Sequence, residues 1–443
     1  MKTRSTAYIL AALLAFAGLA SPAASAQQQQ PTIDKETRGE ISDMLRSAYE
    51  EVSRHYYDPK LQGIDWSARY KTYAERIDTA PNLGEGFRIV AAFLSGLKDS
   101  HTFFVPPGRA VRYESGYRYA LVGNSAFITR IRPNTDAAAK LHIGDEILAM
   151  NGFDVDRRDF DNVRYYFNTL APQLSMKFNL RSPSGEVRPA VVAATARPTK
   201  KVMDLTETGD YEELVRQEQN EDKATRSRII DQGDVAIWKL QHFDLDIDQV
   251  EKTIGIARRH KALVLDLRGN PGGEIESLLL IAASLFDHEI KISDPVTRKE
   301  KDAKPMIARR HGQPFDGKLI VLVDAGSASC SEVLARVIQL EHRGTVIGDK
   351  SAGAVMEARY YPESMGADTK IYYGIQVTMA NLIMTDGKSL EKTGVIPDEL
   401  LLPTAADLAA GRDPVLAHAV EQAGGKLDAE AAGKLFPYEW LPL

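Results

Sequence analysis

The second half of the chain alternates short, almost purely apolar segments with segments of helical periodicity. The apolar segments read VAIWKL, ALVLDLR, LIVLVD and GTVIGD, and the helical segments between them begin at Asp246, Glu274 and Cys330. Strands that are apolar on both faces are typical of parallel sheets covered by helices on each side. The pattern therefore predicts an α/β core over residues 231–405 with a largely parallel sheet. Sites in such sheets gather where strands end and helices begin.

The rest of the chain divides into units of other kinds. Residues 31–105 carry apolar side chains at helical spacing, which predicts an N-terminal helical bundle. Residues 115–199 consist of short β runs, residues 200–230 are charged as expected of a connector, and residues 406–443 are expected to form a helical tail. A chain of 443 residues is long enough for several cores, so we expect a multidomain α/β protein.

Residues 1–26 have the organisation of a secretory signal peptide. Lys2 and Arg4 precede an apolar run from Ala7 to Ala20, and Ala24-Ser25-Ala26 has the small residues of a cleavage site. The apolar run is shorter than an ordinary membrane span, although an uncleaved anchor helix is the alternative. We therefore expect an exported protein, periplasmic or else secreted, with no stable membrane span after cleavage.

Charge and metal-ligand patterns exclude several classes of function. The formal charge of −6 falls to −8 without the two signal-peptide cations, and no basic run is present, so nucleic acid is not an expected partner. The histidines are scattered and no two have H-x-x-x-H spacing, so no metal or other cofactor is expected. Cys330 is the only cysteine, which leaves no internal disulfide. The sequence does not indicate an oligomeric state.

Two loops follow apolar strands of the predicted core. The first runs from Arg268 to Gly273, and the second, GSASCSE, runs from Gly326 to Glu332 at the start of a helix. A serine at a helix start is an ordinary cap, but three serines alternating with small residues exceed what a cap needs. Gly272 and Gly273 free the backbone to direct N–H groups inward, and a helix N-terminus favours negative charge. The two loops together are therefore a candidate oxyanion hole beside a serine hydroxyl. A phosphate-binding loop is the competing reading, but the G-x-x-x-x-G-K-[ST] pattern is missing.

The run Gly144-Asp145-Glu146-Ile147-Leu148, followed by Asn151-Gly152, resembles a signature of PDZ domains. The resemblance spans roughly residues 115–199 and implies a β domain that takes an extended peptide along a sheet edge. Residues 119–123 are then the candidate loop for a peptide carboxylate. The alternative is a PDZ-like unit that no longer captures peptides and acts as a lid or spacer.

Taken in order, the helical leader, the PDZ-like unit and the motifs LDLRGNPGG, GSASCSE and GVIPDE resemble the carboxyl-terminal processing, or tail-specific, serine peptidases. The family pattern puts the nucleophile three residues before a glutamate, which implies Ser329 before Glu332. Its tail-specific branch uses a lysine base in a G-K-G triplet, whereas this chain has Gly353-Ala354-Val355 there. Lys350 lies before that position. A different base is therefore required.

The segment Asp99-Ser100-His101-Thr102-Phe103 is similar to the S-H segment of the tricorn-type branch of the superfamily. Histidine is the commonest base for a neutral serine because its pKa lies near working pH. That branch also has a glutamate just before its G-V-x-P-D segment, which implies a role for Glu391. The resemblance thus implies Ser329 as nucleophile, His101 as base, and Ser100 and Glu391 as polar partners. The oxyanion donors are expected to be the N–H groups of Gly272 or Gly273 and of Cys330.

Without the resemblance, His101 could be a helix-end histidine and Glu391 a solvated carboxylate, and Asp266 and Arg268 are expected to pair and brace their loop. With it, the expected function is an exported serine endopeptidase that hydrolyses peptides or unfolded proteins through an acyl-enzyme. The alternative is a non-catalytic PDZ-bearing protein that binds peptide or lipid on the same fold. Hydrolysis of a non-peptide ester or amide by the same groups is a third possibility.

Overall fold

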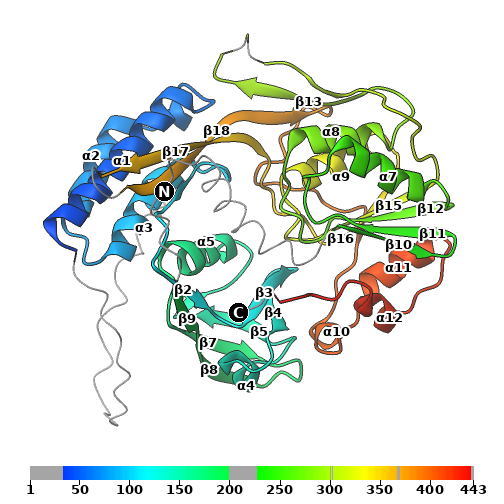
Figure 1. Cartoon of the computed structure of the whole chain (residues 1–443), viewed down its shortest axis with the longest axis horizontal. Helices are drawn as coiled ribbons and strands as arrows, with labels where there is room; N and C mark the ends of the chain where they lie inside the picture. Colours follow the sequence, from blue (N-terminus) through cyan, green and yellow to red (C-terminus); the bar gives the residue numbers. More distant parts are fainter. Residues whose placement is uncertain (1–32, 199–226, 300, 302, 367–369, 441–443) are drawn as a thin grey trace, which may run out of the picture.

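The computed structural model describes residues 33–198, 227–299, 301, 303–366 and 370–440, so the expected signal peptide and most of the expected connector lie outside the described residues. Figure 1 shows three groups of elements around a centre: helices with a long antiparallel hairpin, a small β unit, and an α/β unit.

The N-terminal helices begin at side chains that accept a backbone N–H: Asp34, Asp65 and Asn82 each cap the helix that follows. The apolar faces of these helices pack together and onto strand β18, where Ile375 and Val377 are completely buried. The helices are α1 (Lys35–His55), α2 (Trp66–Asp78) and α3 (Leu83–Leu94). A short 3-10 turn at Leu61–Gly63 lies between α1 and α2, and another at Ser95–Leu97 follows α3.

An antiparallel sheet joins this helical unit to the second half of the chain. Strand β1, which the sequence reading placed in the helical domain, pairs with β18, with Phe104 opposite Ile375. The N-terminal segment thus completes a sheet of strands from far along the chain. The strands are β1 (Phe103–Val105), β13 (Ile290–Thr297), β14 (Met306–Ala308), β17 (Met356–Met365) and β18 (Ile371–Met384).

The small β unit is an antiparallel sheet in the order β3-β4-β5-β7-β8, with β6 beside β5. Residues 119–122, expected to be a carboxylate-binding loop, instead lie in β3, because Tyr117–Val122 pair in a hairpin with β4 and turn at Gly123 (φ 61°). The elements are β2 (Val111–Glu114), β3, β4 (Ser125–Ile131), α4 (Asp136–Lys140), β5 (Glu146–Met150), β6 (Phe153–Asp154), α5 (Phe160–Tyr165), a π-helical turn (Tyr166–Leu170), β7 (Ser175–Arg181), β8 (Val187–Ala193) and β9 (Thr195–Pro198), which pairs with β2.

The α/β unit has a six-stranded sheet in the order β10-β11-β12-β15-β16-β19. Only β10 is antiparallel to its neighbour; the others run parallel, with Val264 opposite Ile320 in the fully buried centre. The strands are β10 (Arg228–Gln232), β11 (Val235–Lys239), β12 (Ala262–Asp266), β15 (Lys318–Val323), β16 (Thr345–Gly348) and β19 (Glu399–Leu400).

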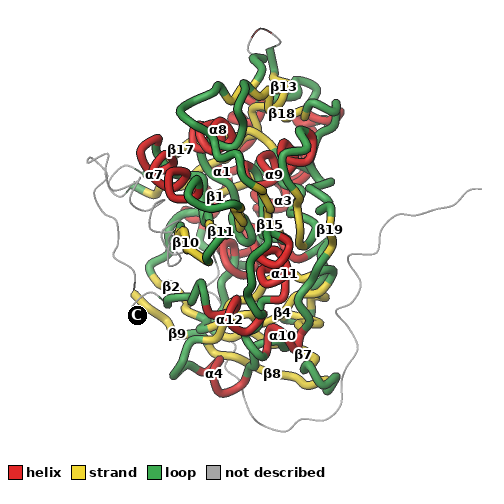
Figure 2. Tube along the Cα trace, turned by 90° about the vertical axis from the view of Figure 1, so that its right-hand side faces the viewer, coloured by secondary structure: helices red, strands yellow, loops and turns green. Residues whose placement is uncertain are grey.

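Helices cover both faces of this sheet (Figures 1 and 2). One face packs on α7 (Ile247–Ala257), α8 (Ile275–Ala283) and α9 (Cys330–Leu340). The other packs on α11 (Pro414–Gln422) and α12 (Ala429–Lys434), after the short α10 (Ala405–Ala409). The C-terminal helices, expected to be a separate tail, therefore complete the α/β core.

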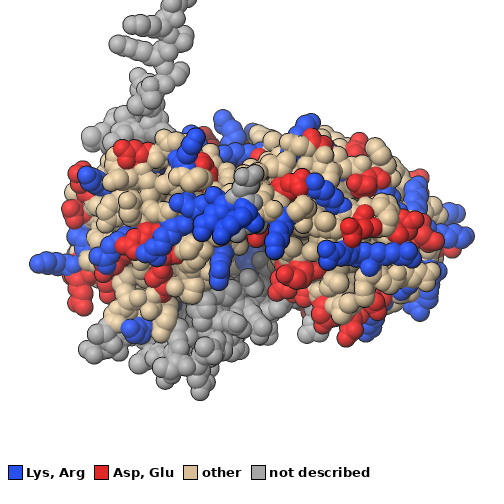
Figure 3. Space-filling model, turned by 90° about the horizontal axis from the view of Figure 1, so that it is seen from above, with Lys and Arg blue, Asp and Glu red and all other residues tan. Residues whose placement is uncertain are grey.

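The described surface carries both signs of charge. In Figure 3 lysine and arginine side chains alternate with acidic ones over the face in view. Over the same described part of the chain, no helix combines the length and apolarity that crossing a bilayer requires.

Candidate active site

The two loops noted in the sequence lie side by side, because they follow the neighbouring parallel strands β12 and β15. Two of the three serines in the second loop form hydrogen bonds that hold the two loops together. Ser327 Oγ donates to Leu267 O at 2.9 Å, and Ser331 Oγ donates to Asn270 O at 2.9 Å. Both serines are completely buried, so their hydroxyls are structural. Ser329, between them, is half-buried and is the serine left for chemistry.

Ser329 sits on a sharp turn between β15 and α9. Its backbone has φ 53° and ψ −119°, a region that essentially only glycine adopts without strain. Gly272 faces it so closely that a Cβ on Gly272 would lie 2.7 Å from Ser329 Cβ and 3.1 Å from Cys330 N. The strained turn directs the serine toward the glycine loop at the start of a helix, as in strand–helix turns that present a nucleophile.

Glu332, one turn along α9, organises the chain opposite Ser329. Its carboxylate accepts hydrogen bonds from Ser351 Oγ (2.5 Å), Gly353 N (2.7 Å), Ala354 N (2.9 Å) and Ser329 N (3.1 Å). Burial raises the pKa of Glu332 to about 6, although these donors favour the charged form. One buried carboxylate thus fixes both the backbone of Ser329 and the loop facing it.

His101, Ser100 and Glu391 form a second group of side chains. Ser100 Oγ lies 2.7 Å from His101 Nδ1 and donates to Glu391 Oε2 at 2.8 Å. Because the hydroxyl proton points to the carboxylate, Oγ is an acceptor for an Nδ1–H. The network therefore favours the tautomer in which His101 Nε2 carries the lone pair, as a general base requires.

The peptide group between Ala354 and Val355 connects the two groups. Its carbonyl accepts the Ser329 N–H at 2.9 Å, and its N–H donates to Glu391 Oε2 at 3.0 Å. Glu391 therefore contacts the same peptide group that contacts Ser329, and Ser100 and His101, from a distant part of the chain, are linked to that group through Glu391. This is the segment at which the resemblance implied a G-K-G triplet in the tail-specific branch, and here it carries Ala354.

Burial shifts the two titratable groups of this network in opposite directions. It lowers the pKa of His101, although the Asp99 carboxylate raises it in part, so the imidazole is neutral at neutral pH. Burial also raises the pKa of Glu391, against its hydrogen bonds from Ser100 and Val355.

The predicted oxyanion donors differ in their surroundings. The Gly272 N–H donates to Asn270 Oδ1 at 2.8 Å, so in this conformation it is engaged within its own turn. Asn270-Pro271-Gly272 is a side-chain-stabilised turn, and that spacing is the signal that could have revealed the engagement. The Cys330 N–H begins α9 beside Gly272, and burial raises the pKa of the Cys330 thiol to about 11.

Asp266 and Arg268 brace the glycine loop, as predicted. Arg268 binds Asp266 at 2.8 Å and Asp413 at 2.7 Å, which ties the loop to α11. Burial alone would raise the pKa of Asp266, but the Arg268 guanidinium and the Lys239 ammonium hold it well below its usual range. This cluster is structural because its charges neutralise one another.

Asp349 connects the small β unit to the segment opposite Ser329. Its Oδ2 accepts from Gly123 N at 2.8 Å and from Arg157 at 2.6 Å, and Arg157 also donates to Lys350 O at 3.0 Å. Sequence reasoning missed this contact and the role of Glu332. The contact of Asp349 could not be predicted because its partners lie in another unit of the chain. The role of Glu332 could not be predicted because an acidic residue in the first turn is ordinary in helices.

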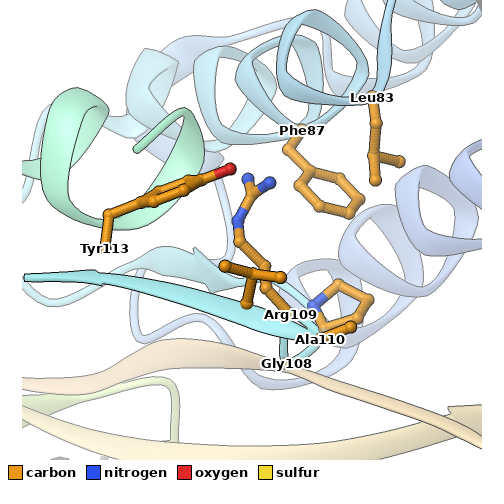
Figure 4. Close-up of a pocket in the computed structure, with 8 residues that line it drawn as sticks. Leu83, Phe87, Gly108, Arg109, Ala110 and Tyr113 are labelled. Carbon is orange, nitrogen blue, oxygen red and sulfur yellow. The ribbon is translucent and has the colours of Figure 1, made fainter. Parts of the chain in front are cut away.

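A cavity of about 340 Å³ lies between α3 and the segment leading into β2. Figure 4 shows the Arg109 guanidinium between the Tyr113 and Phe87 rings. None of the predicted site residues lines it.

Among the described residues, no cluster of histidine, cysteine or carboxylate side chains has the arrangement of a metal site.

Comparison with known proteins finds two matching family models. Residues 234–401 match peptidase family S41, and residues 37–93 match the tricorn protease C1 domain. The carboxyl-terminal-processing protease of Picosynechococcus is 23% identical over 81% of this chain and 83% of its own length. That of Synechocystis is 33% identical over 31% of this chain and 30% of its own length.

The crystal structure of mature CPAF shares 15% identity and a TM-score of 0.64, covering 85% of this chain and 95% of CPAF. This likeness confirms a multidomain α/β fold with a helical N-terminal region. The matched family and the carboxyl-terminal-processing relatives, in turn, confirm the predicted enzyme class. Over residues 234–401 the chain is a serine-type peptidase of family S41, and along most of its length it is similar to a carboxyl-terminal-processing protease.

Proposed function

We propose that the protein is an exported serine endopeptidase that cleaves peptides or unfolded proteins with Ser329 as nucleophile and His101 as base. The observation that carries the proposal is the chain of contacts from His101 Nδ1 through Ser100 to Glu391 and on to the Val355 N–H. It leaves His101 Nε2 as the proton acceptor, and it shares one peptide group with the backbone of Ser329.

In the proposed reaction Ser329 Oγ attacks the scissile carbonyl carbon while His101 Nε2 takes the hydroxyl proton. The carbonyl oxygen becomes an oxyanion stabilised by the N–H groups of Cys330 and Gly273, with Gly272 leaving room for the substrate. His101 then gives its proton to the leaving amine as the C–N bond breaks. Water, deprotonated by the same imidazole, releases the acyl group from Ser329.

Ser100 and Glu391 orient the imidazole during proton transfer. A lysine base is unnecessary in this arrangement, which is consistent with alanine at position 354. The small β unit is proposed to act as a PDZ-like unit beside the site, since it contacts the 349–355 segment through Asp349.

Cleavage of a denatured, fluorescently labelled protein tests this function. Ser329→Ala and His101→Ala should each lower kcat by about 10⁴-fold or more, while Ser184→Ala and His288→Ala at exposed positions should retain parental rates. A fluorophosphonate probe should label Ser329 in the parent and not in Ser329→Ala. Parental cleavage by both site variants, or no labelling at Ser329, would contradict the assignment. Loss with Ser329→Ala alone would point to another base.

Export is proposed from the signal-like sequence at residues 1–26. The exported protein is then expected to begin at Gln27, which N-terminal sequencing of the mature chain checks.

A further inference from the structure

A single oxygen of Asp99 fixes the backbone around His101. Asp99 Oδ1 accepts hydrogen bonds from His101 N at 3.0 Å, Thr102 N at 2.7 Å and Thr378 Oγ1 at 2.7 Å. Two of these donors belong to the loop that carries the base, and the third belongs to β18. The carboxylate therefore closes the loop on itself and fastens it to the sheet.

Thr102 and Thr378 strengthen this attachment. Thr378 N donates to Thr102 Oγ1 at 3.1 Å, and Thr102 Oγ1 donates to Thr378 Oγ1 at 3.1 Å. Both threonines are buried, at 5% and 0% exposure, so water does not compete for these bonds. The backbone of His101 is thus attached to strand β18 through Asp99 and Thr102.

Asp99 is also the carboxylate that acts electrostatically on the imidazole. Burial lowers the pKa of His101, and the charge of Asp99 opposes that shift. Glu391 reaches the imidazole only through the neutral hydroxyl of Ser100. The ammonium groups of Lys98 and Lys392 in the same loops are exposed to solvent.

The second oxygen of Asp99 faces the end of α1. Within the described residues, Asp99 Oδ2 and Tyr56 Oη are both buried atoms without a hydrogen bond of good geometry. The two groups nevertheless interact, because burial first and then the Asp99 carboxylate raise the pKa of Tyr56. Burial likewise raises the pKa of Tyr57, so both phenols stay neutral at working pH. The neighbouring Tyr57 N donates to Thr378 O at 3.0 Å, so α1 ends at the same point of β18.

We propose that Asp99 is a positioning residue for His101: it holds the base on β18 and favours the imidazolium formed in catalysis. The proposal rests on the proposed function of His101. A neutral hydroxyl at Nδ1 orients the ring but supplies no charge, and Asp99 supplies the charge from the backbone side. The C-terminal end of α1 thereby becomes part of the site's support.

Asp99→Asn separates charge from geometry, because the amide oxygen still accepts both loop N–H groups. Asp99→Ala removes charge and geometry together. Asp78→Asn, at the exposed end of α2, is the matched control for a lost carboxylate. The pKa of the His101 imidazole is followed by NMR in full-length protein carrying Ser329→Ala, so the titration does not depend on activity.

Asp99→Asn should lower the His101 pKa and move the acid limb of kcat/KM to lower pH, whereas Asp78→Asn should move neither. Asp99→Ala should lower kcat by about 10²-fold with little change in KM, and Asp99→Asn should retain more of kcat than Asp99→Ala.

An unmoved His101 pKa in Asp99→Asn, or a parental kcat in Asp99→Ala, would overturn the proposal. Full activity of His101→Ala would instead refute the base assignment, while the NMR titration would still test the coupling of Asp99 to His101.

Discussion

Glu332→Gln perturbs the loop opposite Ser329, the proposed nucleophile, while nearly preserving side-chain volume. The carboxylate accepts four donors, two at each oxygen. An amide has one oxygen and one NH2, and the NH2 cannot accept an N–H. In the better orientation the amide oxygen faces Ala354 N and Ser329 N, and the NH2 donates to Ser351 Oγ. The Gly353 N–H then has no acceptor.

Two opposing energies determine the effect of Glu332→Gln on stability. A buried N–H without an acceptor costs about 1–3 kcal/mol. Against this, burial raises the pKa of Glu332 from 4.5 to about 6, so the ionised carboxylate costs about 2 kcal/mol at pH 8. The two effects nearly cancel in the free energy of unfolding. The rate is more sensitive, because a small displacement of the segment opposite Ser329 lowers kcat by about 10²-fold.

The sign of the pH dependence follows from the raised pKa. The protonated form of Glu332 contributes stability that is complete below pH 4.5 and is lost as pH rises through about 6. The parent should therefore gain stability over Glu332→Gln when the pH falls from 8 to 5. The same shift means that the two proteins are nearly equal in stability at pH 8.

Thermal unfolding at pH 5 and pH 8, with kcat and KM on a labelled unfolded protein, measures both effects. Glu341→Gln, at the exposed C-terminal end of α9, is the control and should behave as the parent in both assays. A parental kcat in Glu332→Gln at every pH, or a stability difference that does not change between pH 5 and pH 8, would refute the reasoning.

Three further predictions concern the neighbouring groups. Ser100→Ala should lower kcat by about 10²-fold with little change in KM, because the imidazole loses its link to Glu391; an unchanged kcat in steady-state kinetics would contradict this. Arg157→Ala should destabilise the protein by about 3 kcal/mol in denaturant unfolding, because it strands the Asp349 carboxylate. Arg158→Ala, at a neighbouring position that is 84% exposed, should have almost no effect, and equal losses in the two variants would count against the contact. Because burial raises its pKa to about 11, Cys330 should resist iodoacetamide at pH 8 until the chain is unfolded; rapid labelling of the native protein would be the contrary result.

The α/β core was predictable because its signals are local. Apolar strands and amphipathic helices follow one another in the sequence, and neighbouring parallel strands bring their end loops together, as Leu267 and Ser327 illustrate. The sheet containing β1 was not predictable. Phe104 pairs with Ile375 across most of the chain, and no periodicity within either segment specifies that register.

The candidate site likewise has residues that the sequence predicted and residues that it did not. Ser329, His101, Ser100 and Glu391 came from motif resemblance, and the structure brings them to adjoining segments. Residues that accept hydrogen bonds from backbone N–H groups were missed, because a glutamate or aspartate in a loop or first helical turn has many ordinary roles. Glu332 and Asp99 can be distinguished only by counting the donors around them, which requires the folded chain.

The backbone conformation of Ser329 lowers the stability of the fold but presents the hydroxyl for the proposed chemistry. A side chain held at φ 53° costs about 1–3 kcal/mol, and glycine would avoid that cost. Selection for heat resistance alone would therefore favour Ser329→Gly, and the most robust form of this molecule would be one with no reactivity. The parent tolerates the strained turn because the surrounding hydrogen bonds hold it in place, so thermal stability is a misleading guide when active variants of this chain are sought.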